Sequence, residues 1–327
     1  MQRRWPALDM HFLLDRQAQV ELEPSFTYHW LDDTPARQLR PVTQLIEQLQ
    51  PQLALFDCTG RQQQFKAVKT AGGKLVWLSN RPGKRRKGFR WRTLRLLDLH
   101  LILDSNRQQL ELNAFERWKL RHHPNVRLEL IHGIAPETSL EPPQNTISAA
   151  DPQPYAVFVS GGGGYVHQGR AVPEIFLEAA IRFQAETNKS TLVLMGPQYR
   201  GNRLDHAEVQ LVHSLSTATL SRVLQAAEIA VVGAGNMLTT QAMTAGPACV
   251  LCAVGGHDQP ARVERYQKLG AALAAQVSTE DLSNQAVHLA ENPAVVQKLR
   301  KNARKSRLRN DTERVAKLLY RLLDNER

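Results

Sequence analysis

Short apolar runs alternate with amphipathic stretches along most of this chain of 327 residues. The apolar runs predict strands, and apolar residues at helical spacing predict helices between several of them. The predicted strands cover residues 53–56, 74–78, 99–103, 126–131, 155–159, 191–195, 209–213, 229–232 and 248–254. The clearest predicted helices cover residues 41–49, 62–71, 172–186, 218–226 and 237–245. This alternation predicts an α/β fold, with doubly wound parallel sheets covered by helices on both faces.

One segment interrupts the alternation. Residues 139–154 are rich in proline and small polar residues, which is typical of a linker. We therefore expect an N-terminal domain over residues 1–138 and a C-terminal domain over residues 155–310. A last helix over residues 311–327 would follow, with a return to the N-terminal domain as one possibility. Loops at the carboxyl ends of the strands of two such domains are expected to face each other across a cleft.

Composition excludes several classes of protein. The apolar content of 42% is enough for buried cores, and three cysteines are too few for a disulfide framework. Cys249 and Cys252 lie in a predicted buried strand, where residues three apart point to opposite faces, so a metal or redox pair is not expected. The N-terminus shows no apolar signal segment. These features predict a cytoplasmic protein.

The net charge of +11 is concentrated in clusters. The first lies between positions 81 and 95, contains no acidic residue and is interleaved with Phe89 and Trp91; its members are Arg81, Lys84, Arg85, Arg86, Lys87, Arg90, Arg92 and Arg95. It can be interpreted as a surface that docks on anionic lipid, as a solvated face or as a nucleic-acid patch. Nucleic acid ranks last, because no recognisable binding module accompanies the charge. A second basic cluster, over residues 298–309, is expected to be one face of a helix.

Glycines at the ends of two predicted strands are the strongest candidates for chemistry. The strand over residues 155–159 is followed by Ser160, Gly161, Gly162, Gly163 and Gly164, and the strand over 229–232 is followed by Gly233 and Gly235. Glycines let the backbone turn sharply and approach a ligand closely. A helix that begins after such a turn favours phosphate at its N-terminus. Tight turns also use glycine for purely steric reasons, so these glycines alone indicate a nucleotide site weakly.

The order of motifs over residues 155–275 resembles the donor domain of GT-B glycosyltransferases, in the family-28 branch that includes the peptidoglycan lipid II synthase. It is also similar to nucleotide-sugar hydrolases of the pseudaminic acid pathway. Residues 160–164 match the glycine-rich loop, and residues 227–235 match a hydrophobic strand that ends in glycine. Residues 241–247 resemble the helix that begins with glutamate in the family. Residues 257–272 match the loop whose glutamine contacts the donor sugar.

The resemblance implies a role for each matched residue. Ser160, Gly161, Gly162, Gly163, Gly164, Gly233 and Gly235 would bind the donor diphosphate, and Gln241, Asp258 and Gln259 would bind the ribose and the sugar. Asp258 has an alternative role as the N-cap of the following helix. Gln241 departs from the family, which has a glutamate there; a neutral hydrogen bond contributes about 0.5–1.5 kcal/mol, against about 1.5–3 kcal/mol for a charged one. The N-terminal domain also lacks a counterpart of the family's first strand, since residues 8–14 resemble the second.

Polar residues at the strand ends of the N-terminal half are candidates for work on the acceptor. Asp57 is the candidate general base, with a cap or turn aspartate as the alternative. Asn80 and Arg81 are candidates for binding an acceptor phosphate, and with Arg85 and Arg86 they form a group expected to face the acceptor or a membrane. Asp104 is expected to cap a helix.

We therefore expect two Rossmann-like domains and a glycosyltransferase. It would move a sugar from a nucleoside-diphosphate sugar, with UDP as the expected nucleotide, to a lipid-linked or glycolipid acceptor in envelope polysaccharide or glycolipid synthesis. No cofactor or metal is required by the sequence. The expected location is cytoplasmic, peripheral at the inner face of the plasma membrane. The alternatives are a nucleotide-sugar hydrolase, in which water replaces the acceptor, and a catalytically degenerate scaffold.

Overall fold

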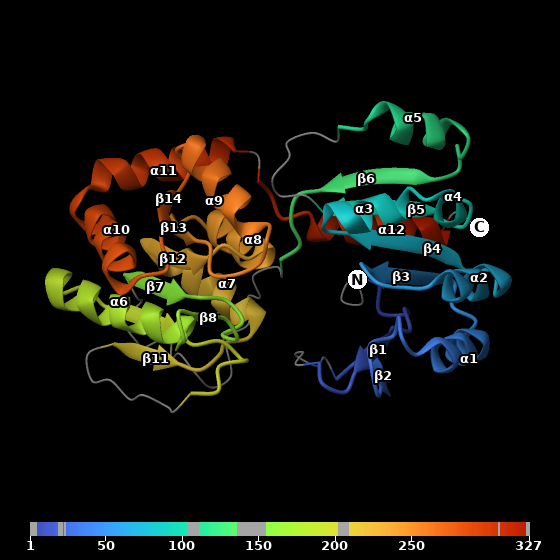
Figure 1. Ribbon diagram of the computed structural model, residues 1–327, viewed down its shortest axis with the longest axis horizontal. Coiled ribbons are helices and arrows are strands. Elements are labelled where there is room, and N and C mark those ends of the chain that lie inside the picture. Colours follow the sequence, from blue (N-terminus) through green and yellow to red (C-terminus); the bar gives the residue numbers. More distant parts are fainter. Residues whose placement is uncertain are drawn as a thin grey trace. The chain divides into compact units, whose positions relative to one another are not determined.

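The computed structural model describes residues 5–18, 22, 24–103, 111–135, 155–201, 209–306 and 308–324. The chain divides into two compact units, shown in Figure 1. Unit 1 comprises Met1–Ile131 and Glu313–Arg327, and unit 2 comprises His132–Thr312. The expected linker over residues 139–154 and the expected cap Asp104 lie outside the described residues.

In the described residues, unit 2 contains a six-stranded sheet in which all neighbouring strands are parallel. Its order is β11 (Gln210–Val212), β10 (Thr191–Leu194), β7 (Ala156–Val159), β12 (Ile229–Gly233), β13 (Ala248–Cys252) and β14 (Leu273–Ala275). The chain starts at β7, proceeds outward to β10 and β11, and then returns to the other side of β7 with β12. This is the order of a doubly wound sheet, and its direction reverses between β7 and β12.

Helices cover both faces of this sheet. One face packs against α6 (Val172–Thr187), α10 (Thr279–Glu291) and α11 (Pro293–Lys305), and the other against α7 (Thr217–Ala226), α8 (Asn236–Ala245) and α9 (Gln259–Lys268). Alternate residues of each strand supply the two cores, as expected for a buried parallel sheet. Cys252 belongs to the first core and Cys249 to the second, which confirms that they point to opposite faces. Each large apolar side chain buried in this way contributes about 1.5–3 kcal/mol.

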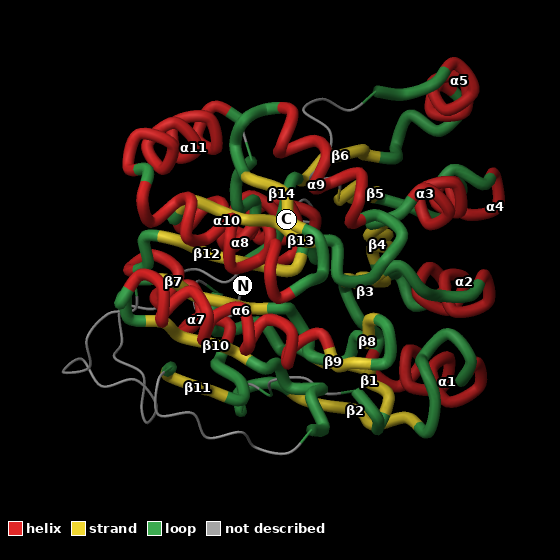
Figure 2. Tube along the Cα trace, turned by 60° about the vertical axis from the view of Figure 1, so that its left-hand side comes forward, coloured by secondary structure: helices red, strands yellow, loops and turns green. Residues whose placement is uncertain are grey.

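The described part of unit 1 contains a four-stranded parallel sheet, with β3 (Leu53–Asp57), β4 (Lys74–Ser79), β5 (Leu99–Leu103) and β6 (Arg127–Ile131) in that order. Its helices are α1 (Leu39–Leu49), α2 (Gln62–Thr70), α3 (Pro82–Gly88), α4 (Trp91–Leu94), α5 (Ala114–Arg121) and α12 (Thr312–Asp324). Figure 2 shows α1, α2 and α3 along one side of these strands. Val42 of α1, Phe65 of α2 and Trp77 of β4 share one buried core.

A separate two-stranded parallel sheet precedes this one. It pairs β1 (His11–Asp15) with β2 (Thr27–Leu31), and the sequence pattern did not predict β2. Leu13 and Leu31 pack against the same buried core as Ala54 and Phe56 of β3. The two sheets of unit 1 therefore rest on one hydrophobic core although they are not hydrogen-bonded into one sheet.

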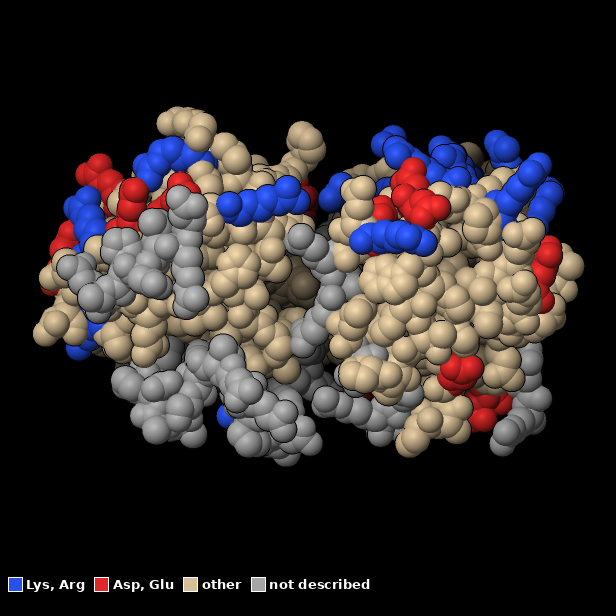
Figure 3. Space-filling view, turned by 90° about the horizontal axis from the view of Figure 1, so that it is seen from below, with Lys and Arg blue, Asp and Glu red and all other residues tan. Residues whose placement is uncertain are grey.

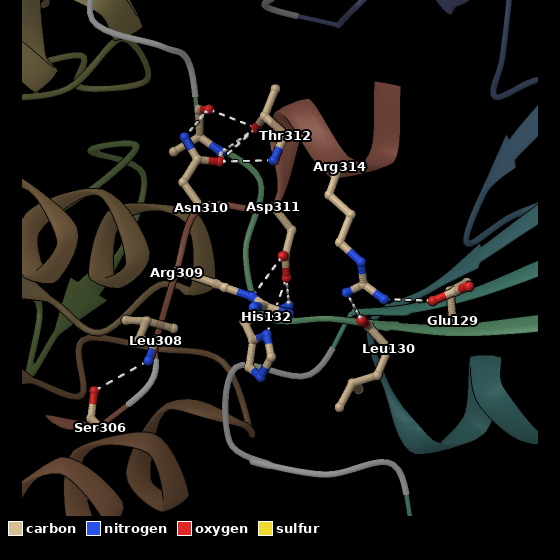
Figure 4. Close-up of polar contacts among 11 residues, drawn as sticks. Glu129, Leu130, His132, Ser306, Leu308, Arg309, Asn310, Asp311, Thr312 and Arg314 are labelled. Atoms are coloured by element: carbon tan, nitrogen blue, oxygen red, sulfur yellow. Dashed lines mark hydrogen bonds and ion pairs between the residues drawn. The ribbon is translucent and has the colours of Figure 1, made fainter. Parts of the chain in front are cut away.

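The chain passes from one unit to the other after Ile131 and again after Thr312. Within unit 2, the segments next to these two points are joined by side chains, as Figure 4 shows. Asp311 is buried, and its Oδ2 accepts the backbone N–H of His132 at 2.7 Å and lies 3.1 Å from His132 Nδ1. The Thr312 hydroxyl donates to the Ala135 carbonyl at 2.7 Å.

From Glu313 onward, the last helix, α12, belongs to unit 1. Arg314 donates to the Leu130 carbonyl at 2.8 Å and pairs with Glu129 at 2.5 Å (Figure 4). The Trp5 and Tyr320 rings are stacked with their centroids 4.3 Å apart. Among the described residues, none of the helices combines the length and the apolar character needed to cross a membrane.

Candidate functional site

The glycine-rich loop leaves β7 where the strand order of unit 2 reverses. Its first residue, Ser160, is buried, and the Ser160 Oγ has no hydrogen-bond partner among the described residues. A Cβ added to Gly233, at the end of β12, would lie 2.1 Å from the Ser160 carbonyl oxygen. The ends of β7 and β12 therefore approach each other so closely that only glycine fits at position 233.

Some of the loop glycines serve packing. Gly163 has φ +87°, and a Cβ there would lie 2.5 Å from the Met195 carbonyl oxygen. Gly196 has φ +94°, and a Cβ there would lie 2.5 Å from the Gly161 carbonyl oxygen. The Gln198 backbone N–H donates to the Gly162 carbonyl at 2.8 Å. The loop after β7 and the loop after β10 are thus interlocked, which is the steric use of glycine.

Two other glycines border open space. Among the described residues, no atom outside the adjacent residues lies within 4 Å of a Cβ added to Gly161 or to Gly235. Gly161 has φ +115°, which favours glycine, whereas Gly235 is extended and is the N-cap of α8. The open space on the Cβ side lets a ligand approach the backbone at the ends of the two central strands. The Gly235 N–H itself donates to the Gly233 carbonyl at 2.8 Å.

The helix that directly follows a glycine turn is α8. After the loop of β7, a small hairpin of β8 (Val166–His167) and β9 (Arg170–Ala171) intervenes before α6 begins at Val172. By contrast, α8 begins three residues after Gly233, with no acidic residue in its first turn and no side-chain cap. Its N-terminus carries about half a positive charge, which favours an anion there.

Gln241, the expected ribose contact, lies inside the helix layer. Its Nε2 donates to the Thr217 carbonyl at 2.8 Å and to Ser221 Oγ at 2.7 Å, and the side chain is buried. Both amide hydrogens are therefore used to join α8 to α7. Only Oε1 is left to accept a hydrogen bond from a ligand.

Gln259, the expected sugar contact, holds the loop after β13. Its Oε1 accepts the backbone N–H groups of Val254 at 2.9 Å and Gly255 at 3.2 Å. A sugar contact from Gln259 would have to come from Nε2. The loop is also close to the glycine-rich loop, because a Cβ on Gly255 would lie 2.2 Å from the ring of Tyr165.

Asp258 and Arg262 form an ion pair that the sequence analysis missed. Asp258 occupies the N-cap position of α9 without a capping hydrogen bond, and its Oδ2 lies 2.6 Å from Arg262 Nη2. Arg262 Nη1 donates to the Ala234 carbonyl at 2.5 Å, in the turn between β12 and α8. The i, i+4 spacing of an aspartate and an arginine was the available signal for the pair, but nothing in the sequence indicated the contact with Ala234.

The candidates in unit 1 follow two neighbouring strands. Asp57 ends β3 and is exposed, and Asn80 and Arg81 follow β4 and are exposed. Since β3 and β4 are parallel, these residues lie at the same edge of the sheet. Cys58 next to Asp57 has φ +59°, and burial, followed by the hydrogen bond and charge of Asp57, raises the pKa of the Cys58 thiol to about 12. Cys58 therefore stays protonated near neutral pH.

Arg85 differs from its neighbours in the first basic cluster. It forms a bidentate pair with Glu116 of α5, with distances of 3.0 and 2.8 Å, and its side chain is only 13% exposed. Arg86 is exposed. The contacts of Arg85 therefore fix α3 to α5. The described part of the chain has no group of three or more His, Cys, Asp or Glu side chains that could hold a metal ion.

Comparison with known proteins bears on the fold. No protein-family model and no curated protein matches the sequence. Solved structures do match. The glycotransferase of kitacinnamycin is 17% identical with a TM-score of 0.59, covering 91% of this chain and 86% of that one. Phytolacca americana UGT2, complexed with UDP-2fluoro-glucose and pterostilbene, is 13% identical with a TM-score of 0.61, covering 96% and 92%. Glycosyltransferase VinC, in complex with dTDP, is 16% identical with a TM-score of 0.52, covering 89% and 76%.

The chain has the GT-B fold. At identities this low the likeness concerns architecture, namely two Rossmann-like domains, and leaves the narrower likeness to the family-28 branch a prediction. Within a GT-B fold, unit 2 is the C-terminal domain, and its reversal point between β7 and β12 is where open α/β sheets bind ligands.

Proposed function

We propose that this protein is a glycosyltransferase that binds a nucleoside-diphosphate sugar at the carboxyl edge of the sheet of unit 2. The observation that carries the proposal is the open backbone at Gly161 and Gly235 beside the N-terminus of α8. The buried, unpaired Ser160 Oγ in the described structure adds a hydroxyl that a ligand could satisfy. Backbone N–H groups, a helix N-terminus and a hydroxyl together suit a diphosphate.

The proposed reaction is a direct transfer. An acceptor hydroxyl oxygen bonds to the anomeric carbon of the sugar while the bond between that carbon and the diphosphate oxygen breaks. The nucleoside diphosphate leaves with the electron pair, and the hydroxyl proton passes to a base, for which Asp57 is the candidate. The N-terminus of α8 would stabilise the negative charge that develops on the leaving diphosphate.

The donor class can be tested by thermal shift of the purified chain with UDP, dTDP, GDP, CDP and UDP-N-acetylglucosamine. UDP and dTDP come first because structures with this fold contain a UDP-sugar or dTDP. Binding to the folded state alone adds about 2.7 kcal/mol of stability at a hundred times the dissociation constant. A shift with one nucleotide supports the proposal and names the donor class. A well-folded sample that responds to none contradicts it and favours a scaffold.

The acceptor is proposed to be a lipid-linked or glycolipid hydroxyl of envelope polysaccharide or glycolipid synthesis. Support comes from the exposed surface of α4 and α5, which we call the aromatic–basic surface. It contains Trp91, Phe115 and Trp118, with the exposed Arg90, Arg92, Arg117 and Arg121. Phe115 is 59% exposed and Trp118 43%; the two rings are stacked, Lys119 lies over the Phe115 ring, and Trp118 packs edge-on against Trp91.

This surface differs from the one expected from sequence. Phe89, expected to be part of it, is buried, because it joins a core with Leu94 and Ile102. The exposed aromatic residues come instead from α5. Figure 3 shows several Lys and Arg side chains along the upper right margin of the face in view. Aromatic rings suit the membrane interface, and each nearby basic residue adds about 1 kcal/mol on an anionic leaflet.

A further inference from the structure

Arg262 is a buried cation in the first turn of α9. Its side chain is 4% exposed. Nη1 donates to the Ala234 carbonyl at 2.5 Å, and Nη2 donates to Asp258 Oδ2 at 2.6 Å. A cation in the first turn of a helix opposes the helix dipole. Burial of a guanidinium also costs several kcal/mol of desolvation, so an apolar side chain would fill this position at lower cost. Both costs indicate that the residue serves something other than packing.

The contact with Ala234 acts on the turn that starts α8. Ala234 lies between the two glycines of that turn, and its own N–H donates to the Cys252 carbonyl at 2.7 Å. Gly235 is the N-cap of α8, and Gly233 touches the Ser160 carbonyl. One guanidinium therefore fixes α9 to the backbone that presents the N-terminus of α8 and that borders the glycine-rich loop.

We propose that Arg262 is the positioning residue of the diphosphate site. It holds the turn from Gly233 to Gly235 in place and puts a fixed positive charge behind the first N–H groups of α8. Asp258 orients the guanidinium from the other side. The inference rests on the proposed function, since it assumes that a nucleoside diphosphate binds at this turn.

The test is isothermal titration of the full chain with UDP, UMP and uridine, or with the thymidine series if dTDP gives the larger thermal shift. Arg262→Met is expected to bind the diphosphate at least about tenfold more weakly, because the turn from Gly233 to Gly235 loses its charge-assisted hydrogen bond to the guanidinium and the N-terminus of α8 loses the positive charge behind it. The monophosphate should lose less, and the nucleoside should bind as it does to wild type. Arg262→Lys, which keeps the charge and loses the fork, should lie between Arg262→Met and wild type.

A further variant controls for folding and for charge in general. Lys268→Met removes a cation from the same helix at a side chain that is 74% exposed, and should bind all three ligands as wild type does.

The outcomes separate the two proposals. If wild type binds none of the nucleotides, the proposed function fails. If wild type binds the diphosphate, and both Arg262→Lys and Arg262→Met bind it as tightly as wild type does, Arg262 has no part in the site. An equal loss for the diphosphate, the monophosphate and the nucleoside would reduce Arg262 to a structural residue.

Discussion

Gly161 and Gly163 follow the same strand, yet the space around them differs. A side chain at Gly161 would meet nothing within 4 Å, whereas one at Gly163 would collide with the Met195 carbonyl. The first glycine leaves the backbone open and the second lets two loops interlock. Residues of one motif therefore have different physical roles. Substitutions at the two glycines should have different effects on protein stability and on ligand binding.

Gly163→Ala is expected to destabilise unit 2 by more than about 1 kcal/mol, since alanine is strained at φ +87° and its Cβ would meet backbone 2.5 Å away. Urea unfolding measures the loss. Gly83→Ala is the control: Gly83 lies in α3 with open space around it and without a positive φ. Alanine there should be neutral or stabilise by about 0.5–1 kcal/mol. Equal stability of Gly163→Ala and wild type would contradict the interlocked loops.

His100 makes stability depend on pH. It is fully buried with Nε2 2.9 Å from Ser79 Oγ, and burial, followed by the charge of Arg85, lowers the pKa of His100 to about 3. The folded state therefore binds this proton less readily than the unfolded state, whose pKa is near 6.5. The contribution of His100 to the free energy of unfolding is fully present above about pH 6.5. It is lost as the pH falls toward 3, by at most about 1.4 kcal/mol per pH unit.

The measurement is the free energy of unfolding at several pH values between 4 and 7.5, for wild type and for His100→Gln. The variant should be less stable at pH 7 and should show a shallower fall toward pH 4. Burial also lowers the pKa of His29 and His123, and both contribute in the same direction in either protein. Equal slopes in wild type and variant would show that His100 does not titrate as its burial implies.

At the scale of elements, α8 connects the candidate site to the rest of unit 2. Its N-terminus borders the open glycine, and its middle is joined to α7 through Gln241. Thr240 on α8 touches Gly133, since a Cβ on Gly133 would lie 2.2 Å from the Thr240 side chain. The position of this one helix thus depends on both α7 and the segment that follows β6.

Gln241→Glu tests whether the residue is structural. A carboxylate would place an acceptor against the Thr217 carbonyl, so we expect a loss of about 1–3 kcal/mol in the free energy of unfolding and no gain in nucleotide affinity. If Gln241 instead binds ribose, the charged acceptor should tighten binding with little loss of stability. Gln44→Glu, on the exposed face of α1, is the control and should leave both quantities unchanged.

At the scale of the whole molecule, the charge and the exposed aromatic residues decide how the protein meets its surroundings. The +11 net charge attracts anionic partners over a range that salt shortens. The aromatic–basic surface adds apolar side chains to that attraction. Anionic membranes offer a partner for both, whereas a purely solvated face would need no exposed rings.

Phe115→Ser with Trp118→Ser should reduce cosedimentation with vesicles of phosphatidylglycerol and phosphatidylcholine several-fold, because the rings no longer enter the interface. Binding of wild type should fall as salt rises and should be weak on pure phosphatidylcholine. Leu269→Ser, at an exposed apolar residue of unit 2, is the control. The membrane proposal is contradicted if the double variant sediments with vesicles as wild type does. It is also contradicted if wild type binds RNA and not vesicles.

The class of fold could be predicted from the sequence alone, because it depends on local patterns. The strands β7, β12 and β13 are apolar runs with glycine or turn residues at their ends, and such runs can be identified without knowing what they pack against. The glycines of the turns could be identified from the sequence for the same reason. The strand β2 was missed, because residues 27–31 mix polar and aromatic side chains and its partner lies outside the main sheet.

Which residues of the candidate site are available to a ligand depends on tertiary contacts that the sequence does not show. Arg85 is paired with a glutamate 31 residues away, and Arg262 reaches a carbonyl 28 residues away. Gln241 likewise donates both amide hydrogens to residues of α7. A sequence pattern describes neighbours along the chain, whereas hydrogen bonds and close approaches of this kind join segments that meet only when the sheet and its helices have packed.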